Sequence, residues 1–264
     1  MKHRLTIAIL AVGLMGCSSS FTVAEQPPAM VNPVGSDTVD PTLDALQERG
    51  KTLKEFVADL ELSENNLVMG TTSVRTGKAW YQTRSGDDVR LRVVFDKRID
   101  EGKPPKEDKR DYLLTDGWLT DRDYHSKTEV RRQVAAPGEK VNLFQVGKGP
   151  FPLPIGQDKN DVHKEFEIAQ LPPAKEDPGN TIHLQLKPKP NTDLARKFKM
   201  IDVYVDRGNN MPVRIKTVDI NESMERQTDL KNLQVNPEKK VGDADFALPA
   251  LGGDWNSHDE PMKK

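Results

Sequence analysis

Apolar residues recur at every second position along several short segments, and this alternation is the feature that most limits the fold. The clearest runs are residues 89–95, 182–187 and 201–206. Because successive side chains of a β-strand point to opposite faces, each run predicts a strand with one apolar and one solvated face. Strands of this kind are typical of antiparallel sheets.

Turn-forming residues separate the alternating runs. Examples of such turn segments are Asp116-Gly117, residues 206–210 and Asn236-Pro237. Counting the runs between turns gives about ten or eleven strands, so the chain is predicted to be mainly β with a few helices. A sheet of that size tends to curl, and its apolar side then becomes a concave face that needs a cover.

The segment 137–166 is the predicted cover, because the alternation fails there. Val141 and Phe144 suggest a helical turn or two, and Asp158 can cap a short helix ending at Glu165. Between them, three prolines alternate with Phe151, Leu153 and Ile155, which suits neither a helix interior nor a central strand. These apolar side chains need a partner surface, and the open apolar face of the sheet is available. They form either a fixed plug that completes the core or a movable lid over an apolar pocket.

The domain is predicted to begin with a helix over residues 40–50. Asp40 is a good N-cap and Pro41 suits the first helical position. Leu43 and Leu46 share one face, and Gly50 is expected to end the helix.

The N-terminus has the layout of an export signal. A basic start is followed by an apolar run that is shorter than the roughly 20 residues a membrane-spanning helix needs. Leu14-Met15-Gly16-Cys17 resembles a bacterial lipobox, in which a signal of residues 1–16 is removed and Cys17 receives acyl groups such as palmitate. The alternative is an ordinary signal cut after Ala24, which would discard Cys17.

The chain divides into four predicted parts. Residues 1–16 are the signal, 17–39 the lipidated cysteine with a flexible tether, 40–250 the folded domain and 251–264 a disordered tail. We expect Cys17 to place the domain at the membrane. Ser18 follows it in place of the aspartate that often retains lipoproteins in the inner membrane, which favours the outer membrane, facing the periplasm.

Composition and the absence of known motifs argue against several classes of protein function. The chain has 39 basic and 41 acidic residues, which argues against a nucleic-acid-binding protein. A single cysteine allows no disulfide framework, and the five histidines show no metal-ligand spacing. Neighbouring carboxylates lie in polar turns, and no nucleophile motif or phosphate-binding loop is present. We therefore expect no catalytic residue, no metal and no cofactor.

The order of the segments resembles the LolA/LolB family of lipoprotein carriers, and the likeness covers roughly residues 40–250. It rests on the segments 77–81, 89–95, 111–118, 184–189, 201–206, 213–219, 228–233 and 243–249. The resemblance implies an incomplete antiparallel β-barrel with a lid of helices and loops over its concave apolar face. It also implies a pocket for the acyl chains of lipoproteins or other envelope lipids, with a periplasmic carrier as a possible partner.

Candidate pocket residues follow from that resemblance and from the alternation, although each of them can equally be ordinary core. They are Trp80, Leu91, Val93, Phe95, Phe144, Phe151, Leu153, Ile155, Leu184 and Val203. Arg90 or Arg92 corresponds to an arginine that controls the lid in some family members. The expected function is a lipid-anchored carrier or acceptor; the alternative is an envelope-stress or lipid sensor that binds a partner protein through the same fold.

Overall fold

The computed structural model describes residues 39–85, 88–136 and 155–262 of the 264-residue chain. All of them belong to one compact unit that spans residues 32–264. Several predicted features lie outside the described residues: the signal, Cys17 and its tether, and the pocket candidates Phe144, Phe151 and Leu153.

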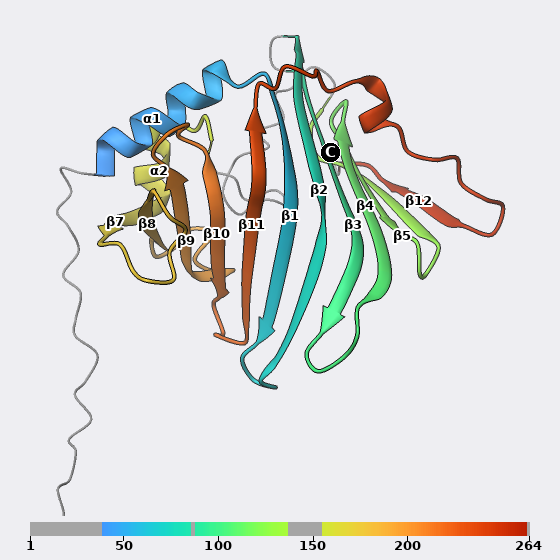
Figure 1. The fold of residues 1–264 in the computed structure, drawn as a ribbon, viewed down its shortest axis with the longest axis horizontal. Coiled ribbons are helices and arrows are strands. Elements are labelled where there is room, and N and C mark those ends of the chain that lie inside the picture. Colours follow the sequence, from blue (N-terminus) through green and yellow to red (C-terminus); the bar gives the residue numbers. More distant parts are fainter. Residues whose placement is uncertain (1–38, 86–87, 137–154, 263–264) are drawn as a thin grey trace, which may run out of the picture. The chain divides into compact units, whose positions relative to one another are not determined.

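A single sheet of twelve strands dominates the described part of the chain, in the order β12-β6-β5-β4-β3-β2-β1-β11-β10-β9-β8-β7 (Figure 1). The strands are β1 (Glu55–Asn66), β2 (Thr71–Ser85), β3 (Asp88–Asp100), β4 (Lys106–Thr115), β5 (Trp118–Asp123), β6 (Thr128–Gln133), β7 (Phe166–Leu171), β8 (Thr181–Pro188), β9 (Phe198–Asp206), β10 (Pro212–Asp219), β11 (Met224–Val235) and β12 (Asn256–Glu260). The sheet does not close, because β7 and β12 form its two edges. This confirms the predicted mainly β, incomplete barrel.

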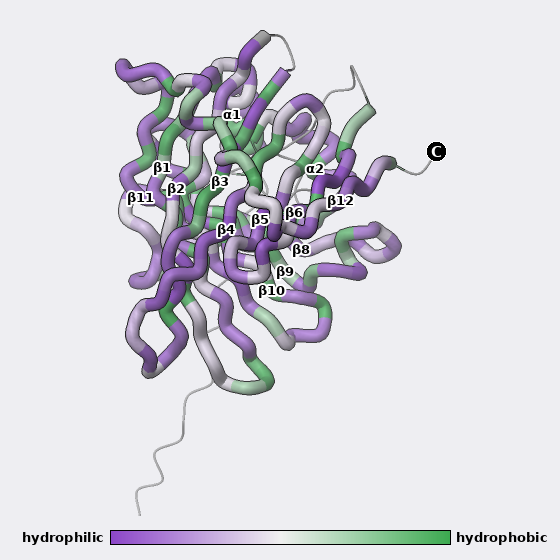
Figure 2. Tube along the Cα trace, turned by 90° about the vertical axis from the view of Figure 1, so that its right-hand side faces the viewer, coloured by the Kyte–Doolittle hydropathy of each residue, from purple (hydrophilic) through white to green (hydrophobic). Residues whose placement is uncertain are grey.

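The strand pairing is antiparallel except between β12 and β6, which run parallel. Register places the apolar positions of neighbouring strands opposite one another. Phe56 of β1 faces Tyr81 of β2, which in turn faces Leu91 of β3. The predicted alternation therefore produces one continuous apolar face, called the inner face below. The change of hydropathy from residue to residue can be followed along the tube in Figure 2.

Two helices cover the inner face near β7–β10 (Figure 1). The first, α1 (Val39–Thr52), buries Leu43 and Leu46 as predicted. The second, α2 (Lys159–Glu165), begins at its predicted N-cap, where the Asp158 side chain accepts a hydrogen bond from the backbone N–H of Asn160. No helix in the described segments is both long enough and apolar enough to cross a membrane.

Gly50 lies inside α1, so the prediction that it ends the helix is wrong. A Cβ atom on Gly50 would lie 2.1 Å from the Cα atom of Gly156. The residue is therefore a point of close backbone contact between α1 and the segment that leads into α2. That role depends on a residue more than a hundred positions away, and no local pattern reports it.

The C-terminal residues are ordered further than expected. A 3₁₀ turn, η2 (Asp243–Phe246), packs on the outer face of the sheet, and β12 then pairs with β6. The prediction of a disordered tail over 251–264 is therefore wrong for residues 256–260. The strand contains no apolar residue, so hydrophobic alternation could not reveal it.

Candidate functional site

The predicted pocket residues of the sheet lie together on the inner face. Leu91, Val93 and Phe95 come from β3, while Leu184 and Val203 come from β8 and β9. All five are buried in one hydrophobic cluster. Ile155 joins this cluster from the covering segment and is only 1% exposed. The structure therefore brings these six candidates together in one apolar cluster.

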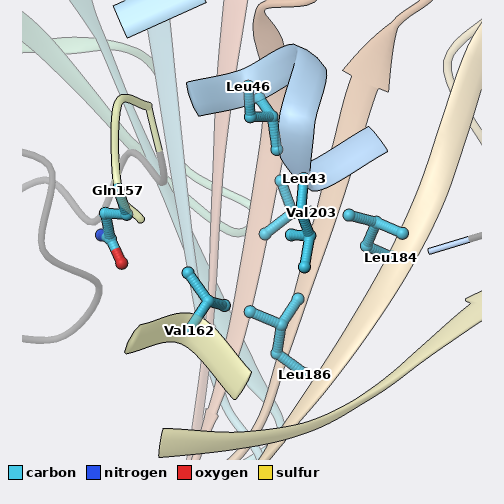
Figure 3. A pocket seen from close by; sticks show the side chains of 7 residues that line it. All are labelled: Leu43, Leu46, Gln157, Val162, Leu184, Leu186 and Val203. Carbon is cyan, nitrogen blue, oxygen red and sulfur yellow. The ribbon is translucent and has the colours of Figure 1, made fainter. Parts of the chain in front are cut away.

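A small apolar cavity lies between the sheet and its cover. Its walls come from α1, α2 and two strands, and Figure 3 shows their side chains around it. The lining residues are Leu43, Leu46, Gln157, Val162, Leu184, Leu186 and Val203. The volume is about 10 Å³. That is close to the minimum for one water molecule, so an acyl chain fits here only if the cover moves.

Most of these lining residues were not predicted as pocket residues. Leu43 and Leu46 were recognised as one face of the first helix, and Leu186 as part of an alternating strand. For Leu186 the available signal was that it shares the inner face of β8 with the predicted pocket residue Leu184, and for Leu43 and Leu46 it was the apolar face of α1. Val162 and Gln157 follow the proline-rich segment, where no alternation indicates which side chains face the core.

The cover is joined to α1 largely by polar contacts at the surface. Lys159 Nζ donates to Asp44 over 2.9 Å, and His163 Nε2 lies 2.8 Å from Asp40 Oδ1. The hydrogen bond to Asp44 raises the pKa of Lys159. Ion pairs as exposed as these add little to stability, because water screens the charges. The polar joints are therefore weak, and burial of the few apolar side chains beneath them holds the cover down.

Backbone contact adds one further joint between the helix and the covering segment. The Gly156 N–H donates to the Leu46 carbonyl over 3.1 Å. Gly156 has a positive φ of 72°, a conformation in which glycine is favoured. This bend directs the chain from Ile155, which is buried under α1, toward Asp158 at the start of α2.

Trp80 lies on the outer face, so its prediction as a pocket residue is wrong. It packs in a second cluster with Leu113, Val241 and Phe246. Its neighbours along the strand, Ala79 and Tyr81, point to the inner face. Adjacent residues of a strand always take opposite faces. Trp80 and Tyr81 are adjacent aromatic residues of β2, and Tyr81 is the one on the inner face.

Arg90 and Arg92 are also on the outer face, which corrects their assignment to lid control. Arg90 donates to Asp243 over 2.8 Å, and its guanidinium lies 3.9 Å from the ring centroid of Phe246. Arg92 donates to the Asp245 carbonyl over 3.0 Å. Both arginines alternate with inner-face residues of β3 and therefore point away from α1 and α2. They hold the C-terminal segment on the outer face.

The inner face becomes charged toward the turn ends of β1 and β2. Arg75 Nη1 lies 2.6 Å from Glu64 Oε2, and Arg75 Nε lies 3.3 Å from Asp108 Oδ2. On β4 and β5, Arg110 pairs with Asp123 over 2.8 Å. The apolar surface is thus bounded on this side by a network of ion pairs. The described residues contain no group of three His, Cys, Asp or Glu side chains placed to hold a metal ion.

Comparison with known proteins gives distant likenesses only. No family model and no curated protein matches the sequence. Among solved structures, an uncharacterized conserved protein from Thermus thermophilus shares 9% identity over 84% of this chain and 99% of its own, with a TM-score of 0.47. A LolA superfamily protein from Nitrosomonas europaea shares 10% over 78% and 97%, with a TM-score of 0.32.

MucB is a third solved structure with a similar fold. It shares 13% identity with this chain over 83% of its length, with a TM-score of 0.48, and the match covers 66% of MucB. MucB has also been solved in complex with MucA. All three comparisons are likenesses of fold at low sequence identity.

Proposed function

We propose that this chain binds the acyl chains of lipids or lipoproteins in an apolar space bounded by the inner face of its sheet, by α1 and by the cover, which is the segment from Ile155 to Glu165. The observation that carries the proposal is the contrast between the two layers. The sheet side is a continuous apolar surface on rigid strands, while the cover is short and joined through exposed polar groups. No step of this function needs a catalytic residue.

Approximate energies make an exchange between cover and ligand feasible. Lifting the cover exposes Leu43, Leu46, Ile155 and Val162, which are buried in the closed form. At ~1.5–3 kcal/mol for each side chain, exposure costs roughly 6–12 kcal/mol. A buried methylene contributes ~0.8 kcal/mol. An acyl chain of about 8–15 buried methylenes therefore offsets the opening, which matches the length of membrane-lipid chains and excludes short ones.

The proposed location follows from the N-terminal sequence. Cleavage before Cys17 and acylation of its thiol would tether the domain to the membrane from which its ligands come. With Ser18 at the next position, we propose the outer membrane, facing the periplasm. A domain tethered there can receive acyl chains from a soluble carrier without leaving the membrane surface.

Bound lipid is the direct test of the proposal. The chain with Cys17→Ser, which cannot be acylated, is purified and examined by native mass spectrometry, and a fluorescent long-chain fatty acid is titrated into it. We expect co-purified lipid or saturable probe binding. Ile155→Asp should weaken binding, whereas Val68→Asp, at a residue 78% exposed, should not. A lipid-free protein that binds no probe would mean that the covering segment is a fixed plug.

Carrier and sensor roles differ in what happens to the ligand. A carrier or acceptor passes its acyl chain to vesicles or to a second protein, whereas a sensor retains the ligand and changes its affinity for a partner. Transfer of the fluorescent fatty acid from loaded protein to lipid vesicles therefore separates the two. We expect transfer, because a cover joined by exposed ion pairs that opens to admit a ligand can open again to release it.

A further inference from the structure

The edge strand β12 is attached to the sheet without any buried side chain. It pairs in parallel with β6, in a register that runs from Asn256 opposite Thr128 to Glu260 opposite Arg132. All five of its residues are exposed. Register is strongly specified only where one face of a strand is buried. Backbone hydrogen bonds and a few polar side chains must therefore define the position of β12.

The polar contacts of β12 have a consistent charge pattern. Arg131 Nη1 lies 3.3 Å from Asp259 Oδ2, and Arg132 Nε lies 2.8 Å from Glu260 Oε2. Lys127, just before β6, pairs with Asp254. The sheet edge thus supplies three basic groups and the added segment three acidic ones. Every one of these side chains is more than 40% exposed, so each pair adds little stability and depends on salt.

One aromatic contact completes the attachment. The ring of Trp255 meets Tyr124 edge to face, with 5.1 Å between the centroids. Lys109 Nζ lies 4.5 Å from the centroid of the same tyrosine ring. Tyr124 therefore offers an aromatic platform at the start of the β6 edge, and its hydroxyl is buried without a hydrogen-bond partner in the described parts of the chain.

We propose that the β6 edge is a docking site for an extended acidic segment of a partner protein, and that β12 occupies it as an exchangeable strand. Strand addition of this kind takes its affinity from main-chain hydrogen bonds and its specificity from alternate side chains. The contacts define the segment: an acidic residue followed by an aromatic one, then two acidic residues four and five positions after the aromatic. Any chain with this pattern satisfies the same basic groups and the same tyrosine.

The charge of the edge selects among possible partners. Arg131, Arg132 and Lys127 would repel a basic segment. An uncharged segment would remove the acidic partners of Arg131 and Lys127 and leave Arg132 only the longer contact with Asp121, at 3.8 Å. Because β12 buries none of its own side chains, a competing segment has to replace the exposed ion pairs, the contact with Tyr124 and the hydrogen bond that Ser257 Oγ donates to the buried Glu129 carboxylate over 2.9 Å. Displacement frees the edge of β6 without uncovering the apolar cluster on the inner face. Docking at this edge is therefore independent of acyl-chain binding under the cover.

Binding in trans tests the proposal. A labelled peptide with the sequence of residues 253–262 is titrated by fluorescence anisotropy into two chains that carry Cys17→Ser: the full chain and one lacking residues 254–264. We expect the shortened chain to bind at least about tenfold more tightly, because its edge is free. Arg131→Glu with Arg132→Glu in the shortened chain should weaken binding about tenfold or more, since each pair becomes a repulsion. Equal binding by the charge-reversed chain, or none by the folded shortened chain, would overturn the proposal.

Hydrogen exchange on the full chain covers the case in which the shortened chain fails to fold. We expect amides of β12, and those of β6 that face it, to exchange much faster than the amides that join β3 to β4. Protection of β12 equal to that of β4 would show a permanent strand and overturn the proposal. Sedimentation adds a last check: a dimer of the full chain that is lost with Asp259→Lys and Glu260→Lys would assign the edge to a second copy of this chain instead.

Discussion

Gly50 of α1 and Gly156 of the covering segment pack backbone against backbone, so that a Cβ atom on Gly50 would lie 2.1 Å from the Cα atom of Gly156. Gly50→Ala should therefore push the cover away from α1. Alanine favours an α-helix by about 1 kcal/mol over glycine, but overpacking costs ~1–3 kcal/mol. We expect a net loss of stability on urea unfolding, together with tighter binding of a fatty-acid probe because the closed form is weakened.

Gly179→Ala is the matched control for this substitution, because a Cβ atom there meets nothing within 4 Å. It should leave probe binding and stability almost unchanged. If Gly50→Ala proved as stable as the parent chain and bound the probe equally well, the close approach of α1 to the cover would not hold the closed form together.

An ion pair with a fully buried carboxylate joins β3 to β4 on the outer face. Asp111 is fully buried, and Arg92 donates to both of its carboxylate oxygens, over 2.9 and 2.6 Å. Removing one member of a buried pair leaves an uncompensated charge and costs about 3–5 kcal/mol. Asp111→Ala should therefore lower the free energy of unfolding by that amount, as measured with urea.

Two controls locate the cause of that loss. Glu48→Gln breaks an exposed pair with Lys51 and should change stability by less than about 1 kcal/mol. The double variant Arg92→Met with Asp111→Leu removes both charges and should be more stable than Asp111→Ala alone. A double variant that is as unstable as the single one would assign the loss to packing instead of charge.

The sequence predicted the parts of the fold that depend on local pattern. Alternation identified the inner-face residues of β3, β8 and β9, and the Asp158 cap located α2 correctly. What failed depends on contacts between distant segments. Gly50 was interpreted as a helix end because its partner, Gly156, is remote in sequence. β12 was missed because it has no apolar residue and is held by charges.

The candidate site was predicted in the same uneven way. Leu91, Val93, Phe95, Leu184, Val203 and Ile155 do lie in the cluster beneath the cover. Trp80 was predicted as a pocket residue, and the error is one position along a strand. Arg90 and Arg92 were lid-control candidates only through the family resemblance, whereas their alternation with Leu91 and Val93 indicates the outer face.

Two aspartates on β5 should respond to pH in opposite directions. Burial raises the pKa of Asp121, against the opposing effect of Arg132 and Arg110. A carboxyl with a higher pKa when folded holds more protons in the folded state, so its ionisation destabilises the fold. Asp121→Asn should therefore be more stable than the parent chain at pH 7. The difference should shrink as the pH falls through the raised pKa of Asp121 and should be essentially gone below ~3.9, the ordinary aspartate value.

Asp123 provides the comparison two residues further along the chain. Burial acts to raise its pKa, but hydrogen bonds from the backbone N–H groups of Ser126 and His125, together with Arg110, lower it overall. Its ionised form therefore stabilises the fold above the ordinary aspartate pKa, and this contribution is lost as the pH falls through the lowered value. Asp123→Asn should destabilise the chain at pH 7. Urea midpoints that shift in the same direction for both variants would contradict this assignment.

Affinity should depend strongly on the length of the acyl chain. Each additional buried methylene contributes ~0.8 kcal/mol, which corresponds to roughly a fourfold gain in affinity. Fatty acids of increasing length, competing with a fluorescent probe, should therefore bind in steps of about this size until the site is filled. Affinity that does not vary with chain length would indicate binding through the head group at the charged part of the inner face.

The central claim is that the cover, residues 155–165, must separate from α1 and from the sheet before an acyl chain can bind. The most direct measurement uses the chain with Cys17→Ser, Asp44→Cys and Lys159→Cys, in which a cleavable thiol cross-linker replaces the ion pair between α1 and α2. The control places the same cross-linker within α1, at Glu48→Cys and Lys51→Cys. We predict that joining α1 to α2 weakens binding of a fluorescent fatty acid about tenfold or more, that cleavage restores it, and that the control binds throughout. Equal binding by the joined and cleaved forms, or no binding by either, would contradict the account.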